Sequence, residues 1–354
     1  MESDQGPNCS VAFELAQSKG YKAVLGCKIG INVVGLLVLI YSYSTVIKTQ
    51  KFAALHTNVR LALHLHAYYI AHVIVFIVTV NSIDLTRLSL IHEDKCNYLL
   101  PFALTYIIRE GYMFGILGQT LTFVFLSIER IVATFRKGYE HNTSKKFFIY
   151  STILNFVTCF GYGYVYLGYD VDWSAKTEYF TQQNQNNAPR SAWFVYIIIA
   201  CECFSIILYN ITYYLNSRGT NKINFQEKRI NQINKSLTEK YQIDENRKVI
   251  KLMLPVCWIH FIMYMSSYIG YFVFIETLFA NDDVVATILT EIFGFITLYA
   301  YVFSGRILSY FVRKPKVTNA TTKETTSQYF SQMNALFQST SGLSQKNKGR
   351  ISSN

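Results

Sequence analysis

The chain has 354 residues, of which 51% are hydrophobic and 16% aromatic, and its formal net charge at pH 7 is +11. Its mean hydropathy is +0.19, which is too apolar for an ordinary water-soluble fold of this length. These values favour a membrane protein. They do not call for a nucleic-acid partner, because Lys and Arg also gather on the cytoplasmic face of membrane proteins.

Long stretches without Lys, Arg, Asp or Glu recur along the chain, and two more are interrupted only by Glu202 and Glu291. Each is close to the ~20 apolar residues that cross a bilayer as a helix, the form in which a segment satisfies its own backbone hydrogen bonds in hydrocarbon. The sequence therefore predicts an all-α fold, a multi-pass seven-transmembrane helix bundle. The predicted spans are 29–47, 61–83, 111–128, 147–169, 191–217, 252–275 and 284–305.

The distribution of positive residues predicts the orientation of the bundle. Lys and Arg are retained on the cytoplasmic side, and 25 of the 33 lie in segments 48–60, 129–146 and 216–251 and in the tail from residue 306. The N-terminus is therefore expected outside the cell and the C-terminus inside. The expected regions are an extracellular N-terminus at 1–22, a transmembrane domain at 23–314 and a disordered cytoplasmic tail at 315–354.

Two cysteines lie on the expected extracellular side. Of the seven in the chain, four lie within the predicted spans and Cys27 lies directly beside the first span, so only Cys9 and Cys96 are expected to meet an oxidising compartment. The outer segment 169–190 contains no cysteine, and we therefore expect a disulfide between Cys9 and Cys96. The sequon that begins at Asn8 lies on the same side, which makes Asn8 a candidate glycosylation site.

Histidines are concentrated near the second span, where His56, His64, His66 and His72 account for four of the seven. Their spacing argues against a metal site, because His64 and His66 lie on opposite faces of a helix. The sixth span adds only His260 to this set, too few ligands for a metal bound between helices. We expect no metal and no cofactor.

The third span carries an Arg at each end. Arg109 and Arg130 are separated by ~31 Å of helix rise, which is close to the hydrocarbon thickness, and lie within ~60° of each other around the helix. Arg109 is therefore expected at the outer mouth of a cavity. Alternatively, it extends to lipid headgroups or pairs with Glu110 or Glu291. The residues expected to line or border this mouth are Arg109, Glu110, Tyr112, Met113 and Ile116.

Carboxylates within a membrane span are unfavourable unless they face a partner or a water-filled cavity. We therefore hypothesise a small-molecule pocket whose polar corners are Arg109, Glu202 and Glu291. Alternatively, either acid is protonated and hydrogen-bonded to a neighbouring Tyr or Asn. The aromatic residues expected to wall the pocket from the sixth span are Trp258, Tyr264, Tyr268 and Tyr271.

Glu129 and Arg130 stand at the cytoplasmic end of the third span. Two opposite charges at this place are either a helix-end pair that reaches the interface or part of a switch. The motif "IER" at 128–130 resembles the Asp/Glu-Arg motif of rhodopsin-like G-protein-coupled receptors. That resemblance implies that Glu129 holds Arg130 in the inactive state and that Arg130 is released toward a G protein on activation.

A more specific resemblance lies before the sixth span, in "SLTEKYQIDENRKVIKLMLP". This segment is similar to a Leu-Ser/Thr-x-x-Tyr/Phe-Gln-x-x-Glu-Asn pattern of the nematode serpentine chemoreceptors of the Sra superfamily. The N-terminal "NCSVAFELAQSKGYKAVLGCKIGIN" and the third-span "SIER" look most like class ab, Srab. The resemblance covers residues 8–312, and the matching pattern positions are Leu237, Thr238, Tyr241, Gln242, Glu245 and Asn246.

The resemblance implies a chemosensory G-protein-coupled receptor in the plasma membrane of a sensory neuron. Its expected partners are a small-molecule ligand, a heterotrimeric G protein and membrane lipid; it is expected neither to bind nucleic acid nor to be an enzyme. The alternative is a seven-span ligand-gated channel or transporter, which would keep the pocket but conduct without a G protein.

The sequence departs from the rhodopsin-like pattern in its last two spans. The seventh span lacks Asn-Pro-x-x-Tyr, and in the sixth Pro255 precedes Trp258, so the usual activation hinge is not implied. Pro255 is still expected to bend the sixth span. Residues 306–314 are expected to form a short helix on the inner leaflet that stops at Pro315.

Overall fold

The computed structural model describes residues 9–135, 146–179, 187–227, 233–270, 283–292 and 296–312. In this part of the chain, six helices are long and apolar enough to cross a membrane. Residues 1–311 belong to one compact unit, and the second unit, Val312–Asn354, lies outside the described residues except for Val312.

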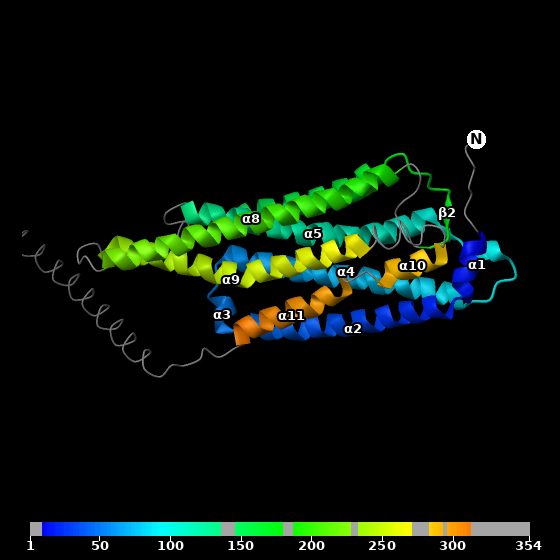
Figure 1. Ribbon diagram of the computed structural model, residues 1–354, viewed down its shortest axis with the longest axis horizontal. Helices are drawn as coiled ribbons and strands as arrows, with labels where there is room; N and C mark the ends of the chain where they lie inside the picture. Colours follow the sequence, from blue (N-terminus) through cyan, green and yellow to red (C-terminus); the bar gives the residue numbers. More distant parts are fainter. Residues whose placement is uncertain are drawn as a thin grey trace, which may run out of the picture. The chain divides into compact units, whose positions relative to one another are not determined.

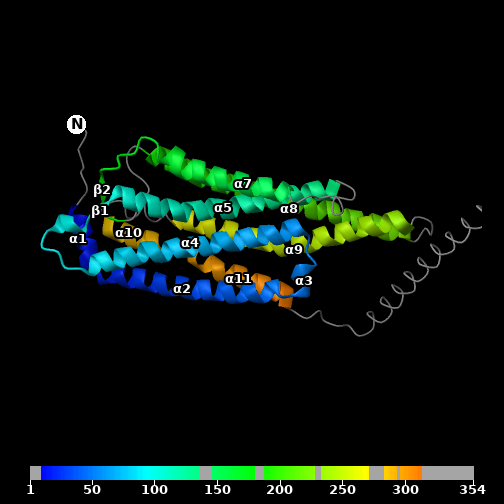
Figure 2. The same ribbon diagram turned by 180° about the vertical axis from the view of Figure 1, so that it is seen from behind.

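The long helices lie alongside one another (Figures 1 and 2). They are α2 (Lys19–Ile47), α4 (Thr57–Ser89), α5 (Phe102–Phe135), α7 (Lys146–Phe160) with the π-helix η2 (Gly161–Leu167) after it, α8 (Ala188–Glu227) and α9 (Ile233–Ile269). The shorter elements are α1 (Cys9–Gln17), α3 (Gln50–Ala53), the 3-10 helix η1 (Lys95–Tyr98), the strands β1 (Leu100–Pro101) and β2 (Lys176–Thr177), α10 (Asp283–Ile292) and α11 (Ile296–Val312).

The helices agree with the spans expected from hydropathy. Over the residues that the structure describes, each of the first six predicted spans overlaps one of the six candidate membrane helices. The seventh, predicted at 284–305, is shared between α10 and α11, which lie on either side of residues 293–295. We call the end that holds α1 the outer end and the end that holds α3 the inner end, in keeping with the charge asymmetry.

Helix α11 extends further than the sequence suggested. Residues 306–312 continue it without a break, so they do not form the separate inner-leaflet helix that was expected. The reason is packing, because Ile307 and Phe311 are buried, and the ring of Phe311 lies 5.7 Å from that of Phe52 in α3. Residues 313–315 and the tail predicted at 315–354 lie outside the described residues.

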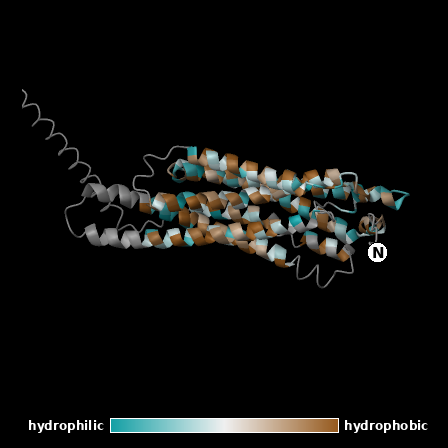
Figure 3. Cartoon of the chain, turned by 90° about the horizontal axis from the view of Figure 1, so that it is seen from above, coloured by the Kyte–Doolittle hydropathy of each residue, from teal (hydrophilic) through white to brown (hydrophobic). Residues whose placement is uncertain are grey.

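The sides of several helices are apolar and exposed. Leu37 of α2 and Val157 of α7 are each 61% exposed, and hydrophobic residues continue along the long helices in Figure 3. Such a continuous apolar surface would be unfavourable in water and suits contact with lipid.

Helices α4 and α5 approach closely because α5 presents glycines to α4. A Cβ atom at Gly118 would lie only 2.4 Å from Cε1 of Tyr69, and one at Gly111 would lie 2.1 Å from Cε1 of Phe76. Tyr69 is fully buried, and its hydroxyl donates to Asn155 Oδ1 in α7 at 3.2 Å. Small residues permit this kind of helix contact in membranes, and they set the distance between the second and third spans.

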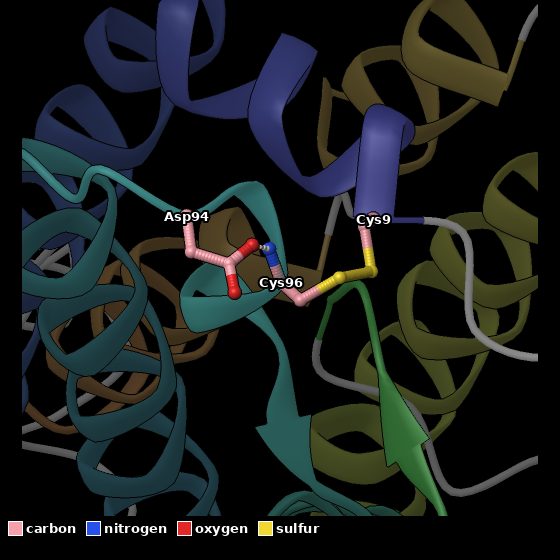
Figure 4. Close-up of a disulfide and its surroundings, with 3 residues drawn as sticks. All are labelled: Cys9, Asp94 and Cys96. Atoms are coloured by element: carbon pink, nitrogen blue, oxygen red, sulfur yellow. Dashed lines mark hydrogen bonds between the residues drawn. A yellow bond between two sulfur atoms is a disulfide. The ribbon is translucent and has the colours of Figure 1, made fainter.

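The outer end is held together by a disulfide and a buried Arg. The structure joins Cys9 in α1 to Cys96 in η1, the pair expected from the sequence, and the Asp94 carboxylate accepts a hydrogen bond from the Cys96 backbone N–H at 2.9 Å (Figure 4). Arg87 of α4 pairs with Asp84 at 2.6 Å and donates to the carbonyls of Tyr98 and Glu178. These contacts fasten the first two outer loops to α4.

We predict that Gly118→Ala destabilises the protein by about 1–3 kcal/mol, because the added methyl group overpacks a site where Tyr69 has little room to move. The measurement is thermal unfolding of the purified chain in detergent. Gly26→Ala is the matched control, since a Cβ atom at Gly26 would meet nothing within 4 Å. Equal unfolding temperatures for the two variants would contradict the prediction.

Candidate functional site

A buried ion pair lies at the inner end of α5. Glu129 and Arg130 are each only 1% exposed, and the guanidinium makes two hydrogen bonds to the carboxylate, one of them between Nη2 and Oε1 at 2.6 Å. A paired geometry of this kind is strong. It also compensates a positive charge whose burial would otherwise be highly unfavourable.

The ion pair is tied to neighbouring helices by amide side chains. Asn246 of α9 accepts from Arg130 Nη1 at 3.0 Å, and Asn58 of α4 donates to Glu129 Oε1 at 3.3 Å. Asn246 also donates to the hydroxyl of Thr134 at 3.4 Å. These contacts connect the second, third and sixth spans. We call the five residues Asn58, Glu129, Arg130, Thr134 and Asn246 the inner polar cluster.

Glu245 adds a second contact between α9 and the start of α4. Its carboxylate accepts from the backbone N–H of His56 at 2.7 Å. Burial lowers the pKa of His56, and the Arg130 guanidinium acts in the same direction, so the imidazole is neutral at pH 7. Its Nδ1 caps α4 by accepting from the Asn58 backbone N–H at 3.4 Å. Glu245 and Asn246, the Glu-Asn pair of the sequence pattern before the sixth span, thus lie where α9 contacts α4 and α5 at the inner end.

We predict that Glu129→Ala lowers the free energy of unfolding by about 3–5 kcal/mol, because it leaves the buried Arg130 without its counter-ion. Thermal unfolding in detergent measures the loss. Glu14→Ala, which removes an exposed carboxylate from α1, is the control. A Glu129→Ala variant as stable as the control would contradict the prediction, because it would show that water solvates the Arg130 guanidinium in place of the carboxylate.

A second polar cluster lies among α5, α8 and α9. Glu202 of α8 is 1% exposed and His260 of α9 fully buried. Glu202 Oε1 accepts from the Thr120 hydroxyl at 2.9 Å and lies 2.7 Å from His260 Nδ1. His260 Nε2 lies 3.2 Å from Gln119 Oε1. We call Gln119, Thr120, Glu202 and His260 the central polar cluster.

The hydrogen bonds of this cluster limit where its protons can lie. Gln119 Nε2 donates to the Tyr69 carbonyl at 3.4 Å, so Gln119 Oε1 faces the ring and His260 Nε2 must carry a proton. A further proton then lies between His260 Nδ1 and Glu202 Oε1. The pair is therefore either an imidazolium with a carboxylate or a neutral imidazole with a carboxylic acid, and both forms have no net charge, as burial requires.

Tyrosine rings surround His260, and two polar atoms beside it lack a hydrogen-bond partner. The rings of Tyr264 and Tyr299 lie 4.3 Å and 4.7 Å from the His260 ring, and the Tyr299 hydroxyl is 2.7 Å from Nε2 of His66. Within the described part of the chain, Glu202 Oε2 and the Tyr264 hydroxyl are buried without a hydrogen-bond partner. Buried polar atoms are usually satisfied, and each of these two is able to form one further hydrogen bond.

The residues expected at the outer mouth are partly brought together. The side chains of Tyr112, Met113, Tyr264 and Tyr268 belong to one hydrophobic cluster in the outer half. Arg109 lies over the Tyr112 ring, 5.0 Å from its centre, and thus borders this cluster.

Two further expectations turn out differently. Glu291 forms an ion pair with Lys28 of α2, a partner not considered from the sequence. Trp258 is 43% exposed and does not wall a pocket, because two residues along a helix turn it to the side opposite His260. Asn8 and Tyr271 lie outside the described residues.

Pro255 lies inside α9 between the two polar clusters. Its nitrogen has no hydrogen, so the carbonyl of Lys251 loses its usual helical partner. Arg306 of α11 supplies one, with Nη2 at 2.9 Å from that carbonyl oxygen. Arg306 of the seventh span therefore replaces the hydrogen bond that α9 lacks at Pro255.

The central polar cluster was only partly visible in the sequence. Glu202 was identified as a charge in an apolar span, whereas His260 was considered only as a metal ligand and Gln119 and Thr120 were not singled out. The available signal was His260 itself, a polar ring within an apolar segment, followed by Tyr264 and Tyr268 at helical spacing.

The chain matches one family of known proteins. A family model described as serpentine type 7TM GPCR receptor class ab chemoreceptor matches residues 7–340, a range that includes both polar clusters and the Cys9–Cys96 disulfide. No curated protein matches the sequence.

Proposed function

Since the chain belongs to the class ab family of serpentine seven-transmembrane chemoreceptors, we propose that it acts as a chemosensory receptor that binds a small environmental molecule and activates a heterotrimeric G protein. The family is a class of membrane receptors. The site of action proposed here is the plasma membrane of a sensory neuron.

The proposed ligand site is the outer side of the central polar cluster. Its support is the pair of unsatisfied buried atoms, Glu202 Oε2 and the Tyr264 hydroxyl, beside the aromatic cluster that contains Tyr112 and Tyr268. A small molecule with an apolar body and a hydrogen-bond donor would bind Glu202 through the donor and the tyrosine rings through the body.

The proposed signal travels along α9. This helix carries His260 in the central polar cluster and Asn246 in the inner polar cluster, ~21 Å apart along its axis, with Pro255 between them. A ligand that changes the His260–Glu202 contact tilts one part of α9 against the other and favours conformations in which Asn246 has left Arg130. Arg130 is then available to a G protein at the inner face.

We predict that Asn246→Ala raises ligand-independent nucleotide exchange by about tenfold, because it removes a hydrogen bond to a charged group worth about 1.5–3 kcal/mol in the inactive state. The purified chain is reconstituted in nanodiscs with heterotrimeric G proteins, and guanine nucleotide exchange is measured. Arg130→Ala is expected to abolish exchange.

The control for this assay is Asn210→Ala, since the Asn210 side chain bonds only to the Ile206 carbonyl of its own helix among the contacts described. Unchanged exchange in Asn246→Ala, with normal folding, would contradict the proposed release of Arg130. Exchange that persists in Arg130→Ala would remove Arg130 from the proposed switch.

The ligand site is tested in the same assay with a panel of small volatiles and metabolites. For any compound that stimulates exchange, Glu202→Gln is expected to lower potency about tenfold, the effect of weakening one hydrogen bond to this side chain. Trp258→Phe, which alters an exposed ring on the same helix as His260, is expected to leave potency unchanged. Equal potency in both variants would place the ligand elsewhere.

A further inference from the structure

Three positive side chains gather where α9 and α11 meet at the inner end. Lys248 and Lys251 are both exposed, and because they are three residues apart they lie on the same side of α9. The Lys251 carbonyl accepts from Arg306 Nη2 at 2.9 Å, and the Lys248 carbonyl accepts from the Tyr310 hydroxyl at 3.1 Å. The two lysines therefore begin directly beside α11. We call Lys248, Lys251 and Arg306 the basic cluster.

Acidic side chains do not balance these charges. Neither α11 nor the part of α9 that follows Glu245 contains Asp or Glu, and Glu245 itself accepts from the His56 backbone N–H. Among the described residues, neither Lys248 nor Lys251 forms an ion pair. Cations this close together on a helix repel one another, so an anion bound here would remove an unfavourable interaction.

The basic cluster lies at the inner membrane boundary. The sequence predicts that the sixth span begins at residue 252 and that the seventh ends at residue 305, next to Lys251 and Arg306. Anionic lipids give the inner leaflet a negative surface, which attracts basic residues directly beside a membrane span. The headgroups of this leaflet are therefore the anions that such a cluster meets first.

Exposed apolar side chains continue from the basic cluster toward the middle of the membrane. Trp258 and Ile262 lie two and three turns after Lys251 and within ~20° of it around the helix, and they are 43% and 55% exposed. On α11, Val302 lies one turn before Arg306 and is 37% exposed. A lipid whose headgroup binds the basic cluster would thus lay an acyl chain against these side chains.

The arrangement of the cations favours a headgroup with several phosphates. Guanidinium and ammonium groups both form charge-assisted hydrogen bonds with phosphate. Lys248 and Lys251 are ~4.5 Å apart along α9, whereas Arg306 comes from another helix. The single negative charge of an ordinary phosphodiester cannot balance all three cations, but phosphates placed around an inositol ring can contact both helices at once.

We propose that the basic cluster binds a phosphoinositide of the inner leaflet, whose ring phosphates contact Lys248, Lys251 and Arg306 and whose acyl chain lies against Trp258. The proposal does not depend on the chemosensory ligand or on the G protein.

The test uses the fluorescence of Trp258 in the full chain, reconstituted in phosphatidylcholine nanodiscs. Trp173→Phe and Trp193→Phe remove the other two tryptophans of the chain. Phosphatidylinositol bisphosphate with brominated acyl chains is then added, because bromine quenches tryptophan on contact. Each cation contact near a membrane surface changes affinity about fivefold. We therefore expect quenching at a lipid fraction at least about fivefold lower than with brominated phosphatidylserine.

Lys251→Gln removes one cation of the cluster and should raise the lipid fraction needed for quenching about fivefold. Lys48→Gln is the matched control, because it removes the same charge from another exposed lysine at the inner end of a membrane helix, and it should leave the quenching of Trp258 unchanged.

Three outcomes would overturn the proposal. The first is equal quenching by the two brominated lipids at matched negative charge, which would show general attraction of anionic lipid. The second is unaltered quenching in Lys251→Gln when thermal unfolding shows that this variant is folded. The third is full displacement of the lipid by an equal concentration of soluble inositol trisphosphate, which would assign the cluster to a soluble anion.

Discussion

Helix α5 is enclosed by other helices over most of its length. In its most apolar stretch, 67% of the residues are buried. In hydrocarbon, each polar side chain of α5 needs a hydrogen-bond partner, either a carbonyl of its own helix, as for Thr122, or a group on a neighbouring helix. Arg130 reaches α9 through Asn246, and Thr120 reaches α8 through Glu202. The polar residues of one helix therefore determine which helices pack around it, and both clusters follow from this constraint.

The same requirement explains the contact between α9 and α11. Proline leaves a carbonyl without its helical partner, and in a membrane that carbonyl must be satisfied by another segment. Arg306 provides the donor from the seventh span, and the Tyr310 hydroxyl adds a bond to the Lys248 carbonyl at 3.1 Å. The segment of the sixth span before Pro255 is thus held by two side chains of the seventh.

The sequence predicted the helices and the charged residues better than it predicted their partners. Isolated charges in apolar spans are conspicuous, and Glu202, Glu129 and Arg130 were found in this way. Their partners depend on how each helix is rotated, which packing decides: Glu202 meets His260 and Trp258 faces outward. Trp258 and His260 are two residues apart, so their opposite directions on the helix could have been predicted from the sequence. The length of α11 could not, because it depends on contacts with α3.

An even number of membrane crossings returns the chain to the side from which it started, so Cys9 and Cys96 meet only after the two helices between them, α2 and α4, have been inserted in the correct direction. A single failed or inverted insertion would leave one thiol in a reducing compartment. The covalent bond between these two cysteines therefore forms only in molecules whose first two spans were inserted in the correct direction.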